Sequence, residues 1–330
     1  MSKAVSLLDQ PLMLEDAEAL FGAVLDDQYS ADQVSEILVT LADRGEAASE
    51  IAGAARAMRE RMVPLLNAPE NAIDVCGTGG DGSHSLNVST AVSLVVAACE
   101  VPVAKHGNRA ASSKSGAADT LEALGIRLDR TPEENSALLN DLGIAFLFAP
   151  AHHPALGAIA PIRKALGRRT IFNLLGPLCN PARVRCQLIG VAHPDLVPVY
   201  AEAAQMLDYD RLMIVSGMES LDEISIAGPT LIHHWQDGQM TECMFKPEEH
   251  GLTLSPLSAI RGGDADYNAA ALRGLMAGEK SAYRDAVLIN SAAALQIAGE
   301  AESWTEGLEE AEEALDKGLA NALLNCWIAT

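Results

Sequence analysis

From residue 73 onward the sequence alternates between short apolar runs and segments with helical hydrophobic periodicity, and few folds accept such a pattern. Each apolar run ends in a Gly-rich or polar turn, and the five runs lie at residues 73–75, 101–104, 144–148, 188–191 and 212–215. The helical segments are predicted at residues 90–99, 116–124, 132–142, 154–166 and 195–207. Strands that alternate with helices form parallel sheets, because each crossover helix returns the chain to the same end of the sheet. We therefore predict an α/β fold, with a mainly parallel sheet flanked by helices on both faces.

The N-terminal part of the chain, roughly its first 65 residues, shows helical patterns only. Ser30 and Gln33 have the spacing of a capping box. The apolar residues of the helix that follows share one face: Val34, Ile37, Leu38 and Leu41. A second helix is predicted over residues 49–62, and Pro64 and Pro69 end the region. This part of the chain is predicted to be a smaller, all-helical domain.

The last third of the sequence departs from the strand and helix alternation. Residues 235–239, WQDGQ, hold an Asp-Gly pair of the kind that turns a β-hairpin. Two Ala-rich helices are predicted after it, over residues 281–298 and 305–326. We find no internal repeat and no low-complexity segment, so these elements are expected to complete the same α/β unit.

The charge balance limits the partners of the chain. Its 330 residues include 23 Lys and Arg but 45 Asp and Glu, which gives a net charge of −22. A field of this sign repels nucleic-acid backbones and anionic lipid surfaces, so we expect neither nucleic acid nor a membrane as a partner. No apolar run approaches the ~18 residues that a membrane-spanning helix needs. A phosphorylated substrate has to be held locally, by backbone N–H groups, a few basic side chains or a metal ion.

The cysteines and the N-terminus favour a cytoplasmic location. The sequence has six cysteines without a CxxC pair, mostly inside apolar stretches, which is typical of reduced structural thiols. Residues 1–13 lack the apolar core of a secretory signal. The pairs His152-His153 and His233-His234 do not predict a metal site, because neighbours on a strand point to opposite faces and no second ligand pair stands near.

A Gly-rich segment directly follows the first predicted strand. Residues 77–82, GTGGDG, contain four glycines in six positions, a density that lets backbone N–H groups turn toward an anion. On its own this segment also fits a plain turn. Residues 87–90, NVST, open the next helix, however, so the free amides and hydroxyls of that helix start face the same ligand. The two segments together favour a phosphate site, although no Lys follows the last glycine as it does in a Walker loop.

A second polar loop leaves the next predicted strand. It contains residues 105–109, KHGNR, and then residues 112–116, SSKSG, before a helix. The alternative is a solvated surface loop, but a basic, hydroxyl-rich loop is unexpected in a chain of net charge −22. Ligands of open α/β sheets bind in the crevice at the carboxyl ends of the strands. We therefore expect both loops to meet at one anionic ligand.

These motifs resemble, in order, those of the anthranilate phosphoribosyltransferase family. The resemblance rests on residues 77–82, 87–90 and 105–109 and on residues 173–178, NLLGPL, and it spans nearly the whole chain. It implies transfer of the 5-phosphoribosyl group from phosphoribosyl pyrophosphate to the amino group of anthranilate, with release of pyrophosphate, in tryptophan biosynthesis. Such a reaction needs no covalent nucleophile, because electrostatic stabilisation of the separating charges supplies most of the catalysis.

The resemblance also implies the fold of nucleoside phosphorylases and class III phosphoribosyltransferases. It divides the chain into a small helical domain, residues 1–69 with 163–185, and an α/β domain that binds phosphoribosyl pyrophosphate, residues 70–162 with 186–330. It further implies a homodimer that forms through the helical domain.

Two groups of binding residues follow from the resemblance. Phosphoribosyl pyrophosphate contacts are implied for Gly77, Gly80, Asp81, Ser85, Asn87, Val88, Ser89, Thr90, Lys105, His106, Gly107, Asn108, Arg109, Ala110, Ala111, Ser112, Ser113 and Ala117. Anthranilate contacts are implied for Gly77, His106, Asn108, His153, Arg163 and Pro177. Arg163 and Asn108 would position the acceptor, and a guanidinium pairs well with the aminobenzoate carboxylate. Taken without the resemblance, Arg163 also fits an exposed helix residue, and both histidines fit packed or capping residues.

A third group of residues is assigned to Mg²⁺. Asp222 and Glu223 follow a predicted strand, and as an adjacent pair they also fit an ordinary solvated loop. The resemblance assigns them, together with the Ser89 hydroxyl, to two Mg²⁺ ions per active site, and hard oxygen ligands suit this ion. The chain departs from the family pattern at His84, where Asn is common, and at Ser85, where Thr is usual. The hydroxyl is kept at Ser85, so only fine affinity is affected.

Two other functions stay open at this point. A pyrimidine nucleoside phosphorylase of the same fold uses inorganic phosphate, and its chemistry does not require the acidic pair Asp222 and Glu223. A non-enzymatic member of the fold that binds nucleic acid needs a basic surface, which a net charge of −22 opposes. The sequence therefore favours the transferase.

Overall fold

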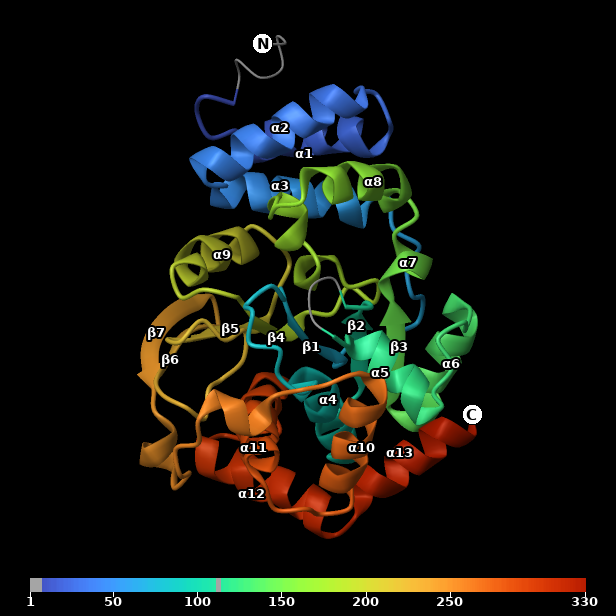
Figure 1. The fold of residues 1–330 in the computed structure, drawn as a ribbon, viewed down its shortest axis with the longest axis vertical. Helices are drawn as coiled ribbons and strands as arrows, with labels where there is room; N and C mark the ends of the chain where they lie inside the picture. Colours follow the sequence, from blue (N-terminus) through green and yellow to red (C-terminus); the bar gives the residue numbers. More distant parts are fainter. Residues whose placement is uncertain (1–7, 111–113) are drawn as a thin grey trace.

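A single β-sheet lies at the centre of the molecule, shown in Figure 1 in a computed structural model that describes residues 8–110 and 114–330. Its strands are β1 (Ile73–Gly77), β2 (Val103–Gly107), β3 (Ile144–Phe148), β4 (Cys186–Gly190), β5 (Arg211–Gly217), β6 (Thr230–Gln236) and β7 (Gln239–Phe245). They form a 7-stranded sheet in the order β3-β2-β1-β4-β5-β6-β7. Neighbours from β3 to β5 are parallel, and β6 and β7 are antiparallel additions at one edge. The predicted mainly parallel sheet is confirmed.

All five predicted parallel strands are present, but β2, predicted over residues 101–104, begins and ends later, at Val103–Gly107. The segment expected to leave the sheet as a loop instead continues β2 to Gly107. Lys105 and His106 pair in register with Phe146 and Leu147 of β3. Two of the expected binding residues therefore lie on a strand, where neighbouring strands hold their backbone, and not on a loop.

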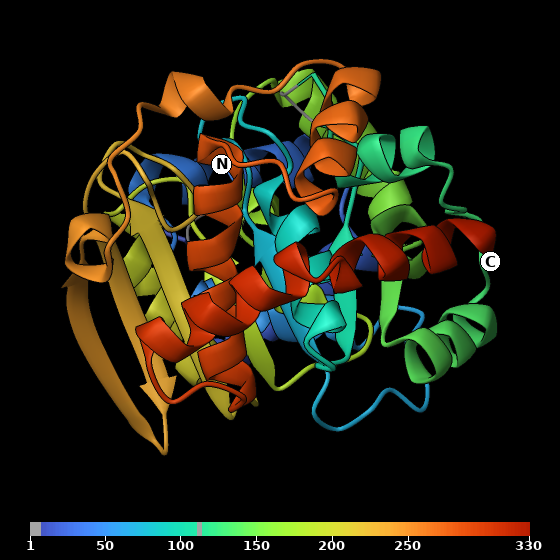
Figure 2. The same cartoon turned by 90° about the horizontal axis from the view of Figure 1, so that it is seen from below.

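The predicted hairpin is also confirmed. Asp237 and Gly238 join β6 to β7 with φ values of 53° and 75°. Positive φ at both central residues is what a type I′ turn requires, and it matches the twist of the two strands. Figure 2 shows the hairpin as the edge of the sheet.

A helical bundle stands over one face of the sheet (Figure 1). It contains α1 (Leu14–Leu25), α2 (Ala31–Arg44) and α3 (Ala48–Arg59), and α8 (Leu156–Leu166) packs on α1 and α2. The capping box at the start of α2 is present: the Gln33 N–H donates to Ser30 Oγ at 3.3 Å, and the Ser30 N–H donates to Gln33 Oε1 at 2.9 Å. The helical N-terminal region is confirmed, although α1 was not predicted, because no side-chain cap marks its start.

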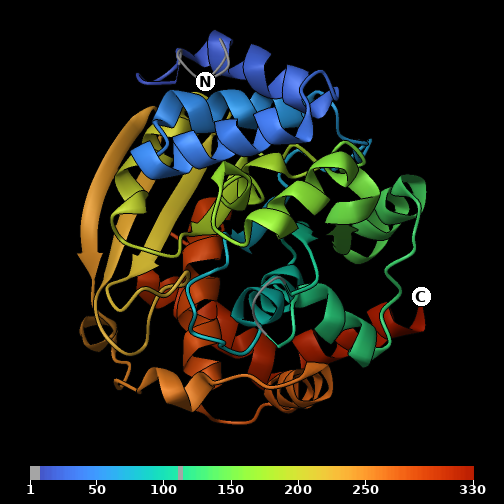
Figure 3. The ribbon, with the colours of Figure 1, turned by 45° about the horizontal axis from the view of Figure 1, so that its top comes forward.

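The helices cover both faces of the sheet, as predicted. The bundle and α9 (Leu196–Gln205) lie over one face, and the other helices lie over the other face or around the sheet (Figures 2 and 3). These are α4 (Val88–Ala98), α5 (Ala117–Leu124), α6 (Pro132–Leu142), α10 (Ala265–Met276), α11 (Ala282–Ala298), α12 (Trp304–Asp316) and α13 (Leu319–Ala329). Strand side chains alternate between the two cores: Leu188 and Met213 face α4 and α11, whereas Ile189 and Ile214 face α9 and the bundle.

The C-terminal helices differ from the prediction in two places. The single helix expected over residues 305–326 is wrong, because Lys317 and Gly318 separate α12 from α13, and Gly318 has a φ of 73°. The helix α10 was not predicted, and it begins where the Tyr267 N–H donates to Asp264 Oδ1 at 2.9 Å.

Short segments complete the fold: α7 (Ala149–His152), η2 (Ile171–Asn173), η3 (Pro177–Cys179), η4 (Pro247–His250) and η5 (Leu257–Ile260). Among the described residues, no helix has the length and apolarity to cross a bilayer.

Candidate functional site

The predicted ligand loops meet at the carboxyl ends of the parallel strands. The Gly-rich loop follows β1, and the acidic pair Asp222 and Glu223 lies shortly after β5. Because β4 separates these two strands, the loops have to meet across its end. The Thr78 N–H donates to the Gly190 carbonyl at 2.9 Å, and the Gly79 N–H donates to Asp222 Oδ2 at 2.8 Å. The two loops therefore form one site.

Two glycines make room for Asp222. A Cβ atom at Gly77 would overlap the Asp222 carboxylate, and a Cβ atom at Gly190 would overlap the Asp222 main-chain carbonyl. Gly79 and Gly80 have φ values of 67° and 80°, in the left-handed region that favours glycine. Sequence reasoning singled out Gly77 and Gly80 but missed Gly190. A glycine at the end of an apolar strand is the signal of close backbone approach that could have found it.

Three carboxyl groups gather at this site. Burial and the neighbouring Asp81 carboxylate raise the pKa of Asp222 to about 7. Burial and the Asp222 charge raise the pKa of Glu223 well above its usual range, although the Lys105 ammonium opposes this. Within the described part of the chain, Asp81 Oδ2 is buried without a hydrogen-bond partner. Carboxylates that repel one another, one of them with an unpartnered oxygen, are suited to a divalent cation.

The donor set fits Mg²⁺ that is shared with a substrate. Within residues 8–110 and 114–330, no group of three His, Cys, Asp or Glu side chains is arranged to hold an ion by itself. Mg²⁺ usually takes one or two carboxylates and completes its shell with phosphate oxygens and water. Asp222, Glu223 and the Ser89 hydroxyl therefore fit an ion whose remaining ligands come from a phosphate-bearing molecule.

The start of α4 lies beside the same acidic pair. Asn87 is the N-cap of the helix, and Val88, Ser89 and Thr90 begin its first turn. The Val88 side chain is buried in the core, and its N–H donates to the Leu86 carbonyl at 2.7 Å, so neither is free to meet a ligand. The Ser89 N–H bonds to Glu223 and partly offsets the rise of that pKa. The N-terminus of a helix attracts anions through these N–H groups and the helix dipole.

Lys105 and His106 are anchored by a buried polar network. Lys105 Nζ donates to a main-chain carbonyl of β1 at 2.6 Å. Asp74, fully buried in β1, accepts from the His106 N–H at 3.1 Å. Asn180 Nδ2 and Gln187 Nε2 donate to the same carboxylate at 2.8 and 3.0 Å. Sequence reasoning did not assign Asp74, Asn180 or Gln187, because each is an ordinary polar residue until the fold brings the three together.

Two histidines form a neutral pair beside this network. His106 Nδ1 lies 3.1 Å from the Gly176 carbonyl and donates to it, and His106 Nε2 lies 3.2 Å from His153 Nε2. Since the His106 proton is on Nδ1, the bond between the rings requires His153 Nε2–H as donor. Burial lowers the pKa of His106 well below its usual value and that of His153 to about 4. Both rings are therefore neutral near pH 7, and Pro177, next to Gly176, is buried with them.

Arg163 has a half-buried guanidinium group with no carboxylate partner in the described part of the chain. The group lies 5.7 Å from the centre of the Phe172 ring, and burial lowers its pKa from the usual value. Two arginines that follow it, Arg168 and Arg169, each pair with a carboxylate. A partly desolvated cation without a counter-ion is suited to binding an anionic ligand.

Arg109 is paired with acidic residues of α5. Its guanidinium lies 2.8 Å from Glu122 and 2.9 Å from Asp119. Bonds to Glu122 and Asp119 raise the pKa of Arg109 above its usual value. It also stacks near Phe148, with 5.7 Å between the guanidinium carbon and the ring centre. In this arrangement Arg109 points along α5, so a contact with phosphate requires these pairs to open.

The remaining predicted residues lie near the ends of the same strands. Gly107 ends β2, Asn108 follows it in an exposed position, and Ala117 begins α5. The Ala110 N–H donates to Asp119 Oδ2 at 3.0 Å, and Ser85 forms a short antiparallel bridge with the segment before α10. The predicted contacts Ala111, Ser112 and Ser113 lie outside the described residues.

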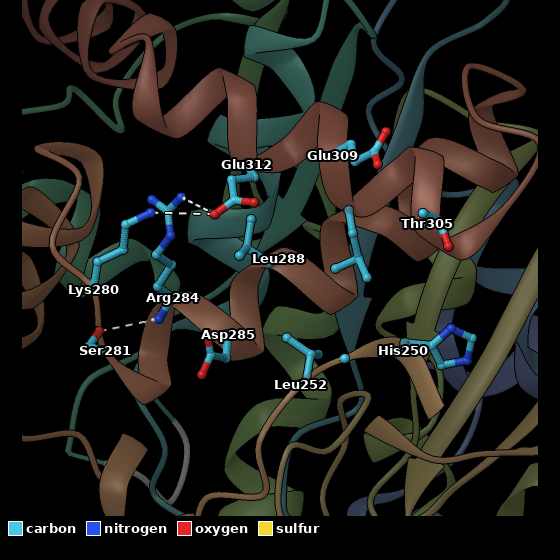
Figure 4. Close-up of a pocket in the computed structure, with 12 residues that line it drawn as sticks. His250, Leu252, Lys280, Ser281, Arg284, Asp285, Leu288, Thr305, Glu309 and Glu312 are labelled. Atoms are coloured by element: carbon cyan, nitrogen blue, oxygen red, sulfur yellow. Dashed lines mark hydrogen bonds and ion pairs between the residues drawn. The ribbon is translucent and has the colours of Figure 1, made fainter. Parts of the chain in front are cut away.

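A separate cavity of about 550 Å³ lies between η4, α11 and α12 (Figure 4). Its lining arginine and lysine share one carboxylate: Arg284 Nη2 and Lys280 Nζ lie 3.3 and 3.4 Å from Glu312 Oε1. No predicted binding residue lines this cavity. The residues gathered at the carboxyl ends of the strands are therefore the candidate substrate site.

Two family models match the chain. Residues 69–321 match the glycosyl transferase family, a/b domain, and residues 7–62 match the glycosyl transferase family, helical bundle domain. A relative from Novosphingobium aromaticivorans, named anthranilate phosphoribosyltransferase, is 64% identical over 97% of this chain and 96% of its own. A relative of the same name from Sphingopyxis alaskensis is 58% identical over 100% of this chain and 99% of its own.

Solved structures agree with the sequence comparison. The crystal structure of anthranilate phosphoribosyltransferase from Thermus thermophilus superimposes with a TM-score of 0.94 and 41% identity, over 99% of both chains. The enzyme of that name from Saccharomyces cerevisiae, solved in complex with phosphoribosyl pyrophosphate and Mg, superimposes with a TM-score of 0.85 and 30% identity over 96% of this chain and 92% of its own. Both comparisons cover the helical and the α/β parts.

Proposed function

The chain belongs to the anthranilate phosphoribosyltransferase family, and we propose that the crevice at the ends of β1, β2, β4 and β5 carries out the reaction of that family. The reaction transfers the 5-phosphoribosyl group of phosphoribosyl pyrophosphate to the amino group of anthranilate, giving N-(5-phosphoribosyl)anthranilate and pyrophosphate in tryptophan biosynthesis. The observation that carries the proposal is the bond from the Gly79 N–H to Asp222, which joins the loop proposed to bind phosphate to the carboxylate proposed to bind the metal.

Phosphoribosyl pyrophosphate would lie between the Gly-rich loop and the start of α4. Gly77 ends β1, Gly80 and Asp81 belong to the loop, and Asn87 and Ser89 belong to the helix start. Backbone N–H groups of both elements would hold the anionic oxygens, working against the net charge of −22. As the bond to pyrophosphate breaks, these fixed dipoles stabilise the negative charge that grows on the leaving group.

Magnesium dependence is proposed on two grounds. The yeast enzyme was solved with phosphoribosyl pyrophosphate and Mg, and the acidic pair of this chain offers hard oxygen donors beside the Gly-rich loop. Asp222, Glu223 and Ser89 would hold the metal, as two ions per site. When bound, Mg²⁺ supplies positive charge to the pyrophosphate leaving group.

Anthranilate would lie in the channel formed by Arg163, His106, His153 and Pro177, with Asn108 at its exposed end. The Arg163 guanidinium would pair with the carboxylate, and the neutral histidine pair would line the aromatic ring without adding charge. An arylamine is a weak nucleophile, so holding its nitrogen close to the ribose contributes much of the rate. No residue is assigned as a covalent nucleophile.

The experiment that tests the proposed function follows the loss of anthranilate fluorescence. We expect the signal to fall only when phosphoribosyl pyrophosphate and Mg²⁺ are both present. A parallel reaction with thymidine and inorganic phosphate tests the nucleoside phosphorylase alternative. Release of thymine in that reaction, without loss of anthranilate in the first, would exclude the transferase.

Replacing Arg163 with alanine should weaken anthranilate binding selectively. The loss of a charge-assisted contact to a carboxylate costs roughly 1.5–3 kcal/mol, which is about a tenfold to hundredfold rise in the KM for anthranilate. The KM for phosphoribosyl pyrophosphate should change little. Steady-state kinetics with each substrate varied in turn measure both values.

Lys164→Ala is the matched control for this prediction, because Lys164 is an exposed cation on the same turn of α8. An exposed substitution should shift either KM by little. Aniline, which has no carboxylate, should react equally poorly with wild type and Arg163→Ala. If Arg163→Ala leaves the anthranilate KM unchanged, the carboxylate is bound elsewhere, and Asn108 or His106 becomes the better assignment.

The assembly and location of the enzyme are also proposals. We infer a homodimer that forms through the helical domain, as the family resemblance implies, and Met13 at the start of the bundle is 69% exposed. Sedimentation equilibrium of the purified chain would measure this directly. A cytoplasmic location is compatible with the six cysteines, which are all unpaired in the structure.

A further inference from the structure

The carboxamide of Asn87 is held from two sides by residues that sequence reasoning did not assign. Thr120 Oγ1 lies 2.6 Å from Asn87 Oδ1, and Asn268 Nδ2 lies 2.9 Å from the same oxygen. Thr120 and Asn268 are both buried, and they come from α5 and α10, which pack against each other. Asn87 makes no side-chain bond to its own helix, although it is the N-cap. Its side chain is therefore oriented by α5 and α10.

A backbone N–H group fixes the orientation of the Asn268 carboxamide and, through it, that of the Asn87 carboxamide. The Gly263 N–H lies 2.8 Å from Asn268 Oδ1, and a backbone N–H can only donate. The atom it meets has to be the oxygen of Asn268, so the other end of that side chain is the NH₂ group. This NH₂ group donates to Asn87, which consequently turns its oxygen toward Asn268. The NH₂ group of Asn87 then points away from both partners, and no described residue accepts from it.

The segment that supplies this N–H is itself fastened beside the Gly-rich loop. The Gly262 N–H donates to the His84 carbonyl at 2.8 Å, and the Leu86 N–H donates to the Ile260 carbonyl at 2.8 Å. A Cβ atom at Gly262 would lie 2.7 Å from the Ser85 carbonyl, so the two segments are in close contact. Main-chain hydrogen bonds therefore hold the segment that contains the Gly263 N–H rigidly next to Asn87.

Thr120 agrees with the same polarity. Its hydroxyl donates to Asn87 Oδ1, because that oxygen has no proton to give. The Thr120 oxygen can then accept from the Ser115 hydroxyl, 2.9 Å away. The Asn87 oxygen thus receives two hydrogen bonds, and turning the carboxamide over would place its NH₂ group against two donors.

We propose that Asn268 and Thr120 are positioning residues that keep the Asn87 NH₂ group facing the substrate as a hydrogen-bond donor to an anionic oxygen of phosphoribosyl pyrophosphate. The inference rests on the proposed function, since it assumes that Asn87 contacts this substrate. Phosphate oxygens only accept hydrogen bonds, so a carbonyl oxygen in the same place would repel them. The orientation of one amide therefore contributes to the affinity of the site for its anionic substrate.

Asn268→Asp tests the proposal by reversing this polarity. The new carboxylate can still accept from the Gly263 N–H, but its second oxygen draws the Asn87 NH₂ group toward itself and turns the Asn87 oxygen to the substrate. We expect the KM for phosphoribosyl pyrophosphate, and the inhibition constant of pyrophosphate, to rise roughly 10- to 100-fold. The KM for anthranilate should stay within about twofold of wild type. Asn268→Ala keeps the Thr120 bond, and its expected rise is roughly two- to fivefold.

Tyr283→Phe is the matched control. The Tyr283 hydroxyl donates to the main-chain carbonyl of Asn87 at 3.0 Å, so it supports the same residue without touching the carboxamide. We expect this variant to leave the KM for phosphoribosyl pyrophosphate near wild type. Melting curves of all variants show whether a change in KM follows a loss of stability. Repeating the assays at high salt separates the reversed hydrogen bond from simple charge repulsion, which salt screens.

The proposal is supported if the rise in the KM for phosphoribosyl pyrophosphate is largest for Asn268→Asp, smaller for Asn268→Ala and smallest for Tyr283→Phe. It is overturned if Asn268→Asp and Asn268→Ala have equal effects, or if the effect of the aspartate disappears in salt. Calorimetric binding of phosphoribosyl pyrophosphate with Mg²⁺ distinguishes this failure from failure of the proposed function. A wild-type chain that binds this ligand without consuming anthranilate would refute the transferase activity, and the order of affinities among the variants would still decide the role of Asn268.

Discussion

Replacing Gly190 with alanine is expected to reduce kcat/KM by roughly 100-fold or more, because the new methyl group overlaps the main chain of Asp222. A backbone carbonyl cannot swing aside as a flexible side chain can. Either the end of β4 or the acidic loop has to move, and both positions bear on the bond between the Gly79 N–H and Asp222. Activity at saturating Mg²⁺, together with a melting curve, measures the effect.

Gly157→Ala is the control for this prediction. Gly157 lies in α8, and a Cβ atom there meets no other atom within 4 Å. Alanine favours a helix over glycine, so this variant should keep its activity and melt slightly higher. If Gly190→Ala retained wild-type activity and Mg²⁺ dependence, the close approach of the two loops would have no part in catalysis.

The double substitution Asp222→Asn with Glu223→Gln should cut turnover at limiting Mg²⁺ by roughly 100-fold or more and leave the fold intact. The neutral amides keep the shape of the loop but remove the charge that attracts the metal. Activity measured against Mg²⁺ concentration tests the loss of turnover, and a melting curve tests whether the fold is intact. An unchanged Mg²⁺ dependence would contradict the metal assignment of the pair.

The stability of the same variant should depend on pH in a defined direction. The pKa of Asp222 is raised to about 7 in the folded chain, so the wild type loses stability as the pH rises from the unfolded value, near 4, through 7. The double variant lacks this loss of stability. The difference in Tm, double variant minus wild type, should therefore be larger at pH 8 than at pH 5. Glu248→Gln with Glu249→Gln removes an exposed adjacent pair and should show no such trend. If the double variant melts well below wild type at pH 8, the carboxylates of Asp222 and Glu223 do not destabilise the fold by repelling one another.

The fold could be predicted where a pattern repeats locally. The five parallel strands, the capping box at Ser30 and the Asp237-Gly238 turn each carry their signal within a few residues, and all three are confirmed. The break between α12 and α13 was missed, because Gly318 stands inside an otherwise continuous Ala-rich pattern. The end of β2 was missed because polar residues there are stabilised by pairing with β3, which is a long-range contact.

The site was predictable only in its motifs. The Gly-rich loop could be found from its own residues and the acidic pair only through the family resemblance, and the structure brings the two together. Gly190 and Asn268 act through contacts with residues distant in sequence, so neither stands out in its own segment. Arg109 shows the opposite case, because a basic residue in a promising loop is paired with Glu122 and Asp119. The domain boundaries at residues 163 and 185 stay a prediction.

The bond between Gly79 and Asp222 spans 143 residues of sequence, and this has a consequence for how the enzyme folds. Contacts of such separation carry a high entropic cost of loop closure and form late unless other contacts have already shortened the path. Here the chain between Gly79 and Asp222 is brought together only when β4 and β5 have joined β1 in the sheet. The substrate crevice is therefore expected to be among the last parts to form during refolding, and the return of activity should lag behind the return of helical circular dichroism.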